Sequence, residues 1–204
     1  MLARSSTGGQ AINPPTSGTK SRLRYNLLMS ILKVARMGHP VLRRKARALE
    51  KGEIKDAAIQ RLIDDMLETM LEYHGVGLAA PQIHESLRIF VAALDAGDEE
   101  SERAPDPIAI INPEITPVGT ETVEDWEGCL SIPDIRGRVP RAREIRVRCY
   151  DRKGDRIELR AHDFPARVIQ HETDHLDGVL FFDRMRAFDS LTFLDEYSRY
   201  WAKD

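Results

Sequence analysis

The strongest pattern in the chain is a helical spacing of apolar residues in its first half. From residue 59 onward, apolar side chains recur three and four positions apart, at Ile59, Leu62, Ile63, Met66, Leu67, Met70 and Leu71. This spacing places them on one face of a helix, which predicts an amphipathic helix with one buried side. Gly75 and Gly77 follow this run and are expected to end the helix.

Short apolar runs in the rest of the chain predict strands. Runs of strand length lie at residues 87–94, 108–111, 145–150 and 156–161. An acidic, turn-rich stretch at residues 95–106 is expected to be a loop, and residues 151–155 are expected to join the last two strands as a hairpin. Strands beside separate helices favour an α+β fold over a strict alternation of strand and helix.

Two further helices are predicted in the last quarter of the chain. The first covers about residues 165–176, with Asp163 as a candidate N-cap and Pro165 in the first turn, where its missing N–H costs nothing. Gly178 is placed to end it. Helical spacing over residues 190–201 predicts a C-terminal helix that starts at about residue 190.

The first 28 residues differ from the remainder of the chain. They carry basic, hydroxyl-bearing, Gly and Pro residues and no acidic residue. We expect a disordered N-terminal extension at residues 1–28 and one domain at residues 29–204, since 204 residues suit a single core. A basic, acid-free N-terminus is also typical of an organelle transit peptide, although the Pro and Gly residues interrupt an amphipathic helix.

Composition and charge exclude several classes of protein. Apolar residues make up 42% and charged residues 31%, a balance typical of globular domains. With 30 basic and 33 acidic residues, the net charge of −3 gives no field suited to nucleic acid. Two cysteines indicate a reducing compartment, and no apolar run approaches the ~20 residues of a membrane span. We expect a cytoplasmic protein without membrane attachment, or an organellar one if residues 1–28 are a transit peptide.

The segment QHETDH at residues 170–175 contains the motif HExxH. His171 and His175 are four residues apart, so both lie on one face of the predicted helix and can bind a single ion, with Glu172 beside it. This arrangement is typical of metal hydrolases. Taken alone, the motif is also compatible with a solvated helix face whose histidines only pack or form hydrogen bonds.

A site with two imidazoles needs at least one further ligand. Cys129 is the candidate, because a thiolate suits iron(II), zinc or nickel, and it lies in the segment EGCLS at residues 127–131. Cys149 lies in an alternating run and is expected to be a small core residue. Spacing alone also leaves open an acidic third ligand, as in many zinc proteases, among the downstream residues Asp177, Asp183, Asp189, Asp195 and Glu196.

The segment GVGLAAPQ at residues 75–82 is a third candidate region. It is too apolar to bind phosphate and lacks the lysine of a phosphate-binding loop. Glycines followed by an apolar run suit a wall along which a peptide backbone can lie, with Gln82 offering an N–H to a developing oxyanion. A tight turn between helix and strand is the alternative interpretation.

Together, GVGLAAPQ, EGCLS and QHETDH resemble, in their order and spacing, the motifs of the peptide deformylases. Members of this family remove the N-formyl group from the N-terminal formylmethionine of newly made polypeptides and release formate. The resemblance extends over about residues 31–186. It implies a single catalytic domain with an α+β fold, in which antiparallel sheets pack around a central HExxH helix.

The resemblance also implies a metal site and a catalytic set. Cys129, His171 and His175 would hold one divalent metal ion, natively iron(II), with zinc, nickel or cobalt as alternatives. Glu172 would take a proton from the metal-bound water and return it to the departing amine. Gln82 and the backbone N–H of Leu130 would hold the oxyanion.

Further roles follow from the same resemblance. Gly77 would offer backbone hydrogen bonds to the bound peptide, and Arg136 would lie near the substrate cleft. Val76 and Leu130 are candidates for the wall of the methionine pocket, and Glu127 would orient groups around the ligands. The implied partners are N-formylmethionyl nascent peptides, with a transient contact to the ribosome and no direct nucleic-acid specificity.

Two positions depart from the usual pattern of the family. Thr173 stands where Met or Ile is usual, and His84 stands where a glycine is common after Pro-Gln. We expect both to bear on stability or on the cleft rim more than on the chemistry. An HExxH endopeptidase with a different third ligand is an alternative, as is a catalytically silent relative that binds nascent chains or ribosomes. The second alternative usually lacks the base or a ligand, whereas here all are present.

Overall fold

The computed structural model describes residues 30–94 and 107–202, so the predictions on residues 1–28 and on the loop at 95–106 lie outside the described residues. The helices and strands within these ranges are, in chain order, α2 (Ala57–Glu72), β1 (Gly77–Ala79), β2 (Ile89–Ala92), β3 (Ile108–Pro117), β4 (Thr122–Cys129), β5 (Ile132–Ala142), β6 (Glu144–Tyr150), β7 (Arg156–His162), α3 (Asp163–Leu176), β8 (Thr192–Phe193) and α4 (Leu194–Tyr200). Short 3₁₀ helices lie at Pro40–Arg43, Glu53–Lys55, Ala80–Ile83 and Phe181–Arg184.

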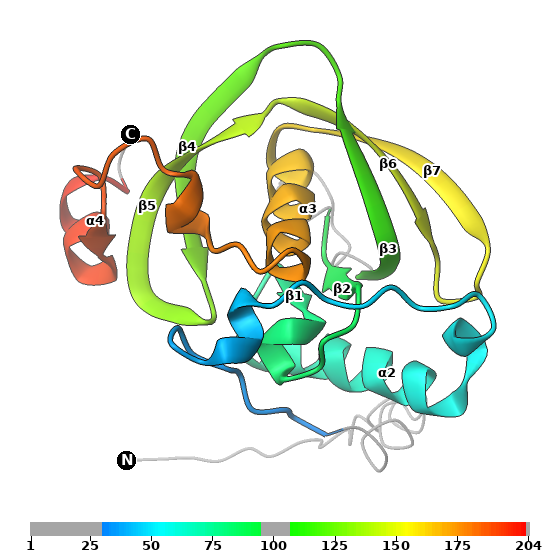
Figure 1. The fold of residues 1–204 in the computed structure, drawn as a ribbon. Coiled ribbons are helices and arrows are strands. Elements are labelled where there is room, and N and C mark those ends of the chain that lie inside the picture. The colour runs from blue at the N-terminus through cyan, green and yellow to red at the C-terminus, as the bar shows by residue number, and fades with distance from the viewer. Residues whose placement is uncertain (1–29, 95–106, 203–204) are drawn as a thin grey trace, which may run out of the picture.

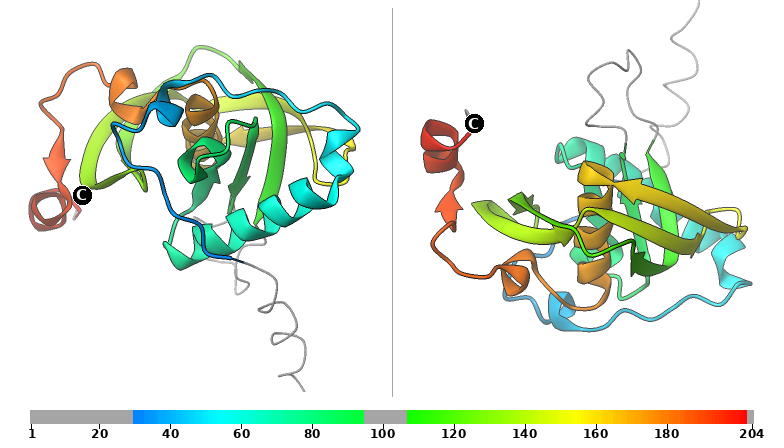
Figure 2. Two further views of the ribbon diagram at one scale, coloured as in Figure 1. Left: turned by 60° about the horizontal axis from the view of Figure 1, so that its bottom comes forward. Right: turned by 90° about the horizontal axis from the view of Figure 1, so that it is seen from above.

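Two antiparallel sheets build the fold around α3 (Figure 1). The larger sheet has the strand order β1-β2-β3-β6-β7, and the smaller one has the order β4-β5-β8. α3 contacts strands of both sheets, while α2 contacts β1 and β2 (Figure 2). The predicted α+β fold with a central HExxH helix is therefore confirmed. Within the described residues, no helix is long and apolar enough to cross a membrane.

β2 is buried on both faces, which fixes the larger sheet between the two long helices. Phe90 and Ala92 pack in one core cluster with residues of α3, whereas Ile89 and Val91 pack in another with residues of α2. Successive side chains of a strand point to opposite faces, so a strand covered on both sides is apolar throughout. The uninterrupted apolar run in the sequence has this cause.

α3 follows the sequence prediction except at its start. Pro165 lies in its first turn, and Gly178 comes just after its end with a positive φ of 74°, the conformation that favours glycine there. The prediction that Asp163 caps the helix is wrong. His162 has the extended conformation of an N-cap residue, with a φ of −133° and a ψ of 160°. Asp163 has a φ of 52°, and its carboxylate accepts a hydrogen bond from Arg143 at 3.0 Å instead of capping the helix.

Several strand boundaries differ from the predictions. β4 and β5 were not predicted, because β4 is mostly exposed and polar in its first half and β5 contains Pro133, Gly137 and Pro140. Those residues are tolerated because β8 pairs with β5 only at Ile135 and Arg136, so most of β5 is an edge. The C-terminal helix begins at residue 194 rather than at about 190, since residues 192–193 form β8.

Candidate metal centre and active site

Three potential metal ligands converge where the β4–β5 hairpin meets α3. The ligand atoms of Cys129, His171 and His175 all lie within 4.8 Å of one another. Cys129 Sγ lies 3.2 Å from His175 Nε2, and the two imidazole rings are 5.1 Å apart. The register of β4 and β5 shifts between Gly128 and Cys129, and such an irregularity re-aims a side chain. α3 supplies the two imidazoles from successive turns of one face.

The protonation of these groups suits metal binding. Burial alone would raise the pKa of the Cys129 thiol, but the adjacent His175 and His171 outweigh it and hold that pKa well below its ordinary value. Burial would lower the pKa of His171, yet Cys129 and Glu127 raise it well above its ordinary value. The lowered pKa of the Cys129 thiol favours the thiolate, which is the form that binds metal.

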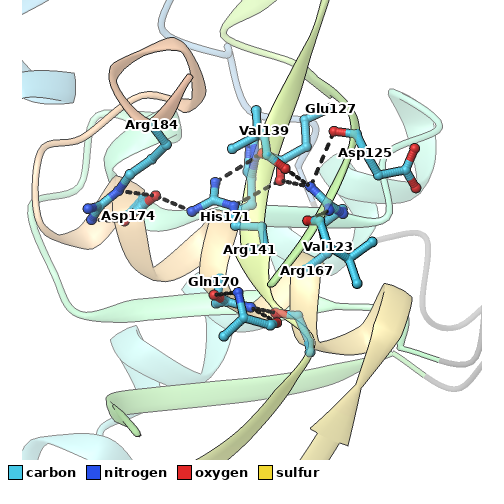
Figure 3. Close-up of polar contacts among 12 residues, drawn as sticks. Val123, Asp125, Glu127, Val139, Arg141, Arg167, Gln170, His171, Asp174 and Arg184 are labelled. Carbon is cyan, nitrogen blue, oxygen red and sulfur yellow. Dashed lines mark hydrogen bonds and ion pairs between the residues drawn. The ribbon is translucent and has the colours of Figure 1, made fainter. Parts of the chain in front are cut away.

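Glu127 anchors His171 within a buried network of charges (Figure 3). Its carboxylate lies 2.9 Å from His171 Nδ1 and accepts hydrogen bonds from Arg141 at 2.9 and 3.0 Å and from Arg167 at 2.8 Å. Burial would raise the pKa of Glu127, but Arg141 and His171 hold it well below its ordinary value. Because Nδ1 faces Glu127, the Nε2 atom of His171 is left for a ligand bond.

Asp174 extends this network toward the 3₁₀ helix at Phe181–Arg184. The Asp174 carboxylate accepts hydrogen bonds from Arg141 at 2.5 Å and from Arg184 at 2.7 and 3.1 Å. Arg141 thus bridges Asp174 and Glu127, and both carboxylates raise its pKa against the effect of burial. The network links β4, β5 and α3 behind the ligands, and Glu127 is its member that contacts the His171 ring.

Glu172 is buried next to His171 in α3, with 4% of its surface exposed. Burial raises its pKa to about 7, although the charges of His171 and His175 oppose this shift. Its Oε2 atom has no hydrogen-bond partner among the described residues. Gly77 packs directly against this carboxylate, and a Cβ at that position would overlap Oε1. A carboxyl group with a pKa near neutrality suits the transfer of a proton.

The side-chain amide of Gln82 is held at the edge of the same site. Its Oε1 accepts a hydrogen bond from the backbone N–H of Ala79 at 2.8 Å, which fixes the direction of the amide. Its Nε2 lies 3.5 Å from Cys129 Sγ and 3.3 Å from Ser131 Oγ. The donor end of the amide therefore faces the ligand cluster.

A cleft of about 640 Å³ opens over these groups. It is lined by most residues that the sequence singles out, namely Val76, Gly77, Glu127, Cys129, Leu130, Arg136, His171 and Glu172. Gln82 and His175 are not among the lining residues, but both lie next to Cys129. Cys129 Sγ is 3.5 Å from Gln82 Nε2 and 3.2 Å from His175 Nε2. Trp126, Phe164 and Leu194 also line the cleft, and sequence reasoning did not find them.

The sequence contained a signal for part of the charge network. Arg167, His171 and Asp174 are spaced four and three residues apart, which places them on the same face of α3 as the motif. Arg141 carried no such signal, because it lies in a strand with several other arginines.

The acidic residues that were alternatives for the third ligand do not join the two histidines in a cluster among the described residues. Asp177 pairs with Arg88 at 2.6 Å, and Asp183 pairs with Arg43, so neither contributes to the three-residue cluster. Cys149 packs in the core cluster on α3, and its burial raises the pKa of its thiol to about 11, as expected for a small core residue. Among the described residues, Cys129 is the cysteine that accompanies the two histidines.

A cysteine and two imidazoles beside a buried carboxyl group, under an open cleft, are typical of a metal-dependent hydrolase. A family model described as polypeptide deformylase matches residues 31–190. Peptide deformylase 2 of Nostoc sp. is 44% identical over 176 residues, which cover 85% of this chain and 97% of that protein. Peptide deformylase 1 of Bordetella pertussis is 45% identical over 154 residues, covering 75% and 86%.

Solved structures give the same result. The class I type b peptide deformylase of Acinetobacter baumannii in its Met-Ala-Ser-bound form is 37% identical, covers 76% of this chain and 99% of that one, and has a TM-score of 0.69. The peptide deformylase of Thermus thermophilus is 47% identical, with coverage of 76% and 86% and a TM-score of 0.66. The chain belongs to the peptide deformylase family and is an enzyme.

Proposed function

We propose that the protein removes the formyl group from the N-terminal formylmethionine of newly made polypeptides. The observation that carries this proposal is the convergence of Cys129, His171 and His175 within 4.8 Å, next to the buried carboxyl group of Glu172. Its partners are formylmethionyl nascent peptides, met in transient contact with the ribosome. A cytoplasmic location is supported by bacterial relatives and by two buried free cysteines.

The donor set fits one divalent metal ion. Cys129, His171 and His175 would hold it, and iron(II), zinc, nickel and cobalt all accept one thiolate with two imidazoles. We propose iron(II) as the native metal. When bound, the ion supplies a Lewis acid that makes water nucleophilic near neutral pH.

The residues around this centre would transfer the proton and bind the oxyanion. Glu172 takes up the proton of the attacking water, for which a pKa of about 7 is suited, and passes it to the departing amine. The water oxygen forms a bond to the formyl carbon, and the bond from that carbon to the methionyl nitrogen breaks. Gln82 Nε2 and the backbone N–H of Leu130 donate to the oxyanion that develops. The products are formate and a free methionyl amine.

Peptide binding follows from the same cleft. Gly77 brings its backbone next to Glu172, where it can form hydrogen bonds with an extended substrate backbone. Val76 and Leu130 contribute apolar surface for the methionine side chain, and Arg136 also lines the cleft. Glu127 acts through His171, which it orients. A relative solved with Met-Ala-Ser supports the assignment of the cleft to a peptide.

The test measures formate released from formyl-Met-Ala-Ser by the metal-loaded protein. We expect Glu172→Gln to lower the rate by roughly 10²–10⁴-fold while it retains the metal. Glu72→Gln, an exposed position on α2, is the matched control and keeps the wild-type rate. Absence of formate from the wild type overturns the function, and equal rates for the wild type and Glu172→Gln overturn the role of Glu172.

A second variant separates the deformylase from an HExxH endopeptidase. Under the proposed function Cys129→Ser loses bound metal, whereas an endopeptidase with an acidic third ligand keeps it. Metal content after dialysis against a weak chelator gives the answer directly. Full retention of the metal by Cys129→Ser contradicts the proposed ligand set.

A further inference from the structure

The side-chain amide of Gln82 is held at both of its ends. Its Oε1 accepts a hydrogen bond from the backbone N–H of Ala79 at 2.8 Å, and its Nε2 donates to the hydroxyl of Ser131 at 3.3 Å. Gln82 and Ser131 are both buried, so water does not compete for these contacts. The contact with Ala79 distinguishes the oxygen of the amide from its nitrogen, and the contact with Ser131 fixes the direction of one N–H.

This arrangement leaves one hydrogen of the Gln82 amide for the reaction. A side-chain amide carries two hydrogens on its nitrogen, and Ser131 accepts one of them. The second can face Cys129, whose Sγ lies 3.5 Å from Gln82 Nε2 in the ligand cluster. Without the hydroxyl of Ser131, the amide would be held only at its oxygen and could turn, because the last side-chain torsion of glutamine has broad minima. The free N–H would then point at the cluster for less of the time.

The backbones that carry Gln82 and Ser131 are joined independently of these side chains. The N–H of Ala35 donates to the backbone carbonyl of Gln82 at 2.6 Å, and the N–H of Met37 donates to the backbone carbonyl of Ser131 at 2.8 Å. In Figure 1 the chain before the 3₁₀ helix at Pro40–Arg43, in blue, passes beside these two loops. Removal of the Ser131 hydroxyl would therefore leave the two backbones in place. The hydroxyl acts on the direction of the amide, not on the spacing of the loops.

We propose that Ser131 is a positioning residue, which holds the Gln82 amide so that its free N–H points at the developing oxyanion. This inference rests on the proposed function, because the oxyanion is that of the formyl group. Ser131 is fully buried and lies outside the cleft lining, so it acts through Gln82 and does not contact the substrate. A donor whose direction is fixed in advance stabilises the transition state without the cost of turning it during the reaction. Removal of the hydroxyl should therefore lower kcat and leave KM nearly unchanged.

The test measures kcat and KM for formate release from formyl-Met-Ala-Ser by the metal-loaded, full-length protein. Complete loss of one oxyanion donor lowers kcat by roughly 10²–10³-fold. In Ser131→Ala the donor is retained but misaligned, so we expect kcat to fall by about 10-fold and KM to change by less than about 2-fold. In the Gln82→Ala background, Ser131→Ala should lower kcat by less than about 2-fold, because no amide is left to position.

A second readout does not depend on turnover. In the ¹⁵N-labelled, zinc-loaded protein, the side-chain amide signals of Gln82 can be assigned by their loss in Gln82→Ala. Their hydrogens should exchange with water faster in Ser131→Ala than in the wild type, by about 10-fold. Ser190→Ala is the matched control, because the Ser190 hydroxyl also accepts an N–H, that of Arg138 at 3.1 Å, and lies outside the cleft lining. It should keep the wild-type kcat and the wild-type exchange.

The possible outcomes separate the role of Ser131 from the proposed function. A wild-type kcat in Ser131→Ala overturns the positioning role and leaves the function standing. The same holds for a full 10-fold loss in the Gln82→Ala background, for unchanged exchange of the Gln82 amide, or for an equal loss of kcat in Ser190→Ala. Absence of formate from the wild type overturns the function itself, and with it the catalytic role of Ser131.

Discussion

Replacement of Glu127 by Gln tests the buried charge network most directly. The substitution keeps the shape of the side chain and removes its charge. The Glu127 carboxylate is 6% exposed overall and accepts hydrogen bonds from Arg141 and Arg167, with His171 Nδ1 at 2.9 Å. After the change, the two guanidinium groups keep their charge in a buried environment with one counter-ion fewer.

The expected magnitude follows from this burial. Removal of one partner from a buried ion pair costs about 3–5 kcal/mol of unfolding free energy. Loss of the carboxylate that orients a ligating histidine lowers metal affinity by roughly 10–100-fold. We therefore expect Glu127→Gln to be less stable by about 3 kcal/mol without metal and to bind metal at least tenfold more weakly.

The dependence of stability on pH gives a second readout. Burial raises the pKa of Glu127, but Arg141 and His171 outweigh it, so the pKa in the folded protein lies below the ordinary 4.5. A carboxyl group of this kind contributes stability that is full above its ordinary pKa and is lost as the pH falls below it toward the folded-state pKa. The wild type should lose stability below about pH 4.5 more steeply than Glu127→Gln.

Asp174→Asn provides the matched control. Asp174 is similarly buried and binds Arg141 and Arg184, but it makes no hydrogen bond to His171. Urea unfolding of the metal-free proteins should show a loss of stability in both variants. Competition with a chelator should show weaker metal binding in Glu127→Gln alone. Wild-type metal affinity in Glu127→Gln, or the same loss in Asp174→Asn, refutes the anchoring role.

Three other substitutions have defined outcomes. Gly77→Ala places a methyl group on the Glu172 carboxylate and should lower kcat by about 100-fold at wild-type metal content, measured as formate release. His84 has a φ of 70°, a conformation that favours glycine, and its ring meets that of His39 edge-on at 4.7 Å. Both His84→Gly and His84→Ala remove the ring, so His84→Gly should be more stable to urea than His84→Ala by about 1 kcal/mol. The reverse order contradicts this. Thr173 Oγ1 is buried without a partner among the described residues, so Thr173→Val should raise unfolding free energy by about 1 kcal/mol, and destabilisation in calorimetry contradicts this.

The parts of the fold that sequence reasoning predicted are those with a periodic pattern, an uninterrupted apolar run or residues that start and end a helix. α2 repeats apolar residues at helical spacing, α3 has Pro165 in its first turn and Gly178 just after its end, and β2 is apolar because both of its faces are covered. The β4–β5 hairpin lacks such a pattern, because its charged side chains serve the buried network or solvent rather than an apolar core. Arg141 looks the same in the sequence whether it is exposed or paired with two carboxylates.

The site divides in the same way. The two histidines could be found from their spacing on one helix. Cys129 and Gln82 were candidates because of their residue types and segments, and the family resemblance implied the same roles for them. Sequence reasoning could not assign Trp126 and Leu194 to one cleft, because they are far apart in the chain and β8, which precedes Leu194, is brought there by its pairing with β5. The pairing of a short strand such as β8 with a distant strand leaves no pattern in the local sequence.

The ligand atoms come from two separate structural elements. The sulfur of Cys129 lies at the tip of the β4–β5 hairpin, and the two imidazoles lie on α3. An ion held between them acts as a cross-link, so its binding energy also resists separation of the hairpin from the helix. Amide hydrogens of β4 and β5 should then exchange more slowly in the loaded protein than in the stripped one, while those of β6 and β7 remain nearly unaffected.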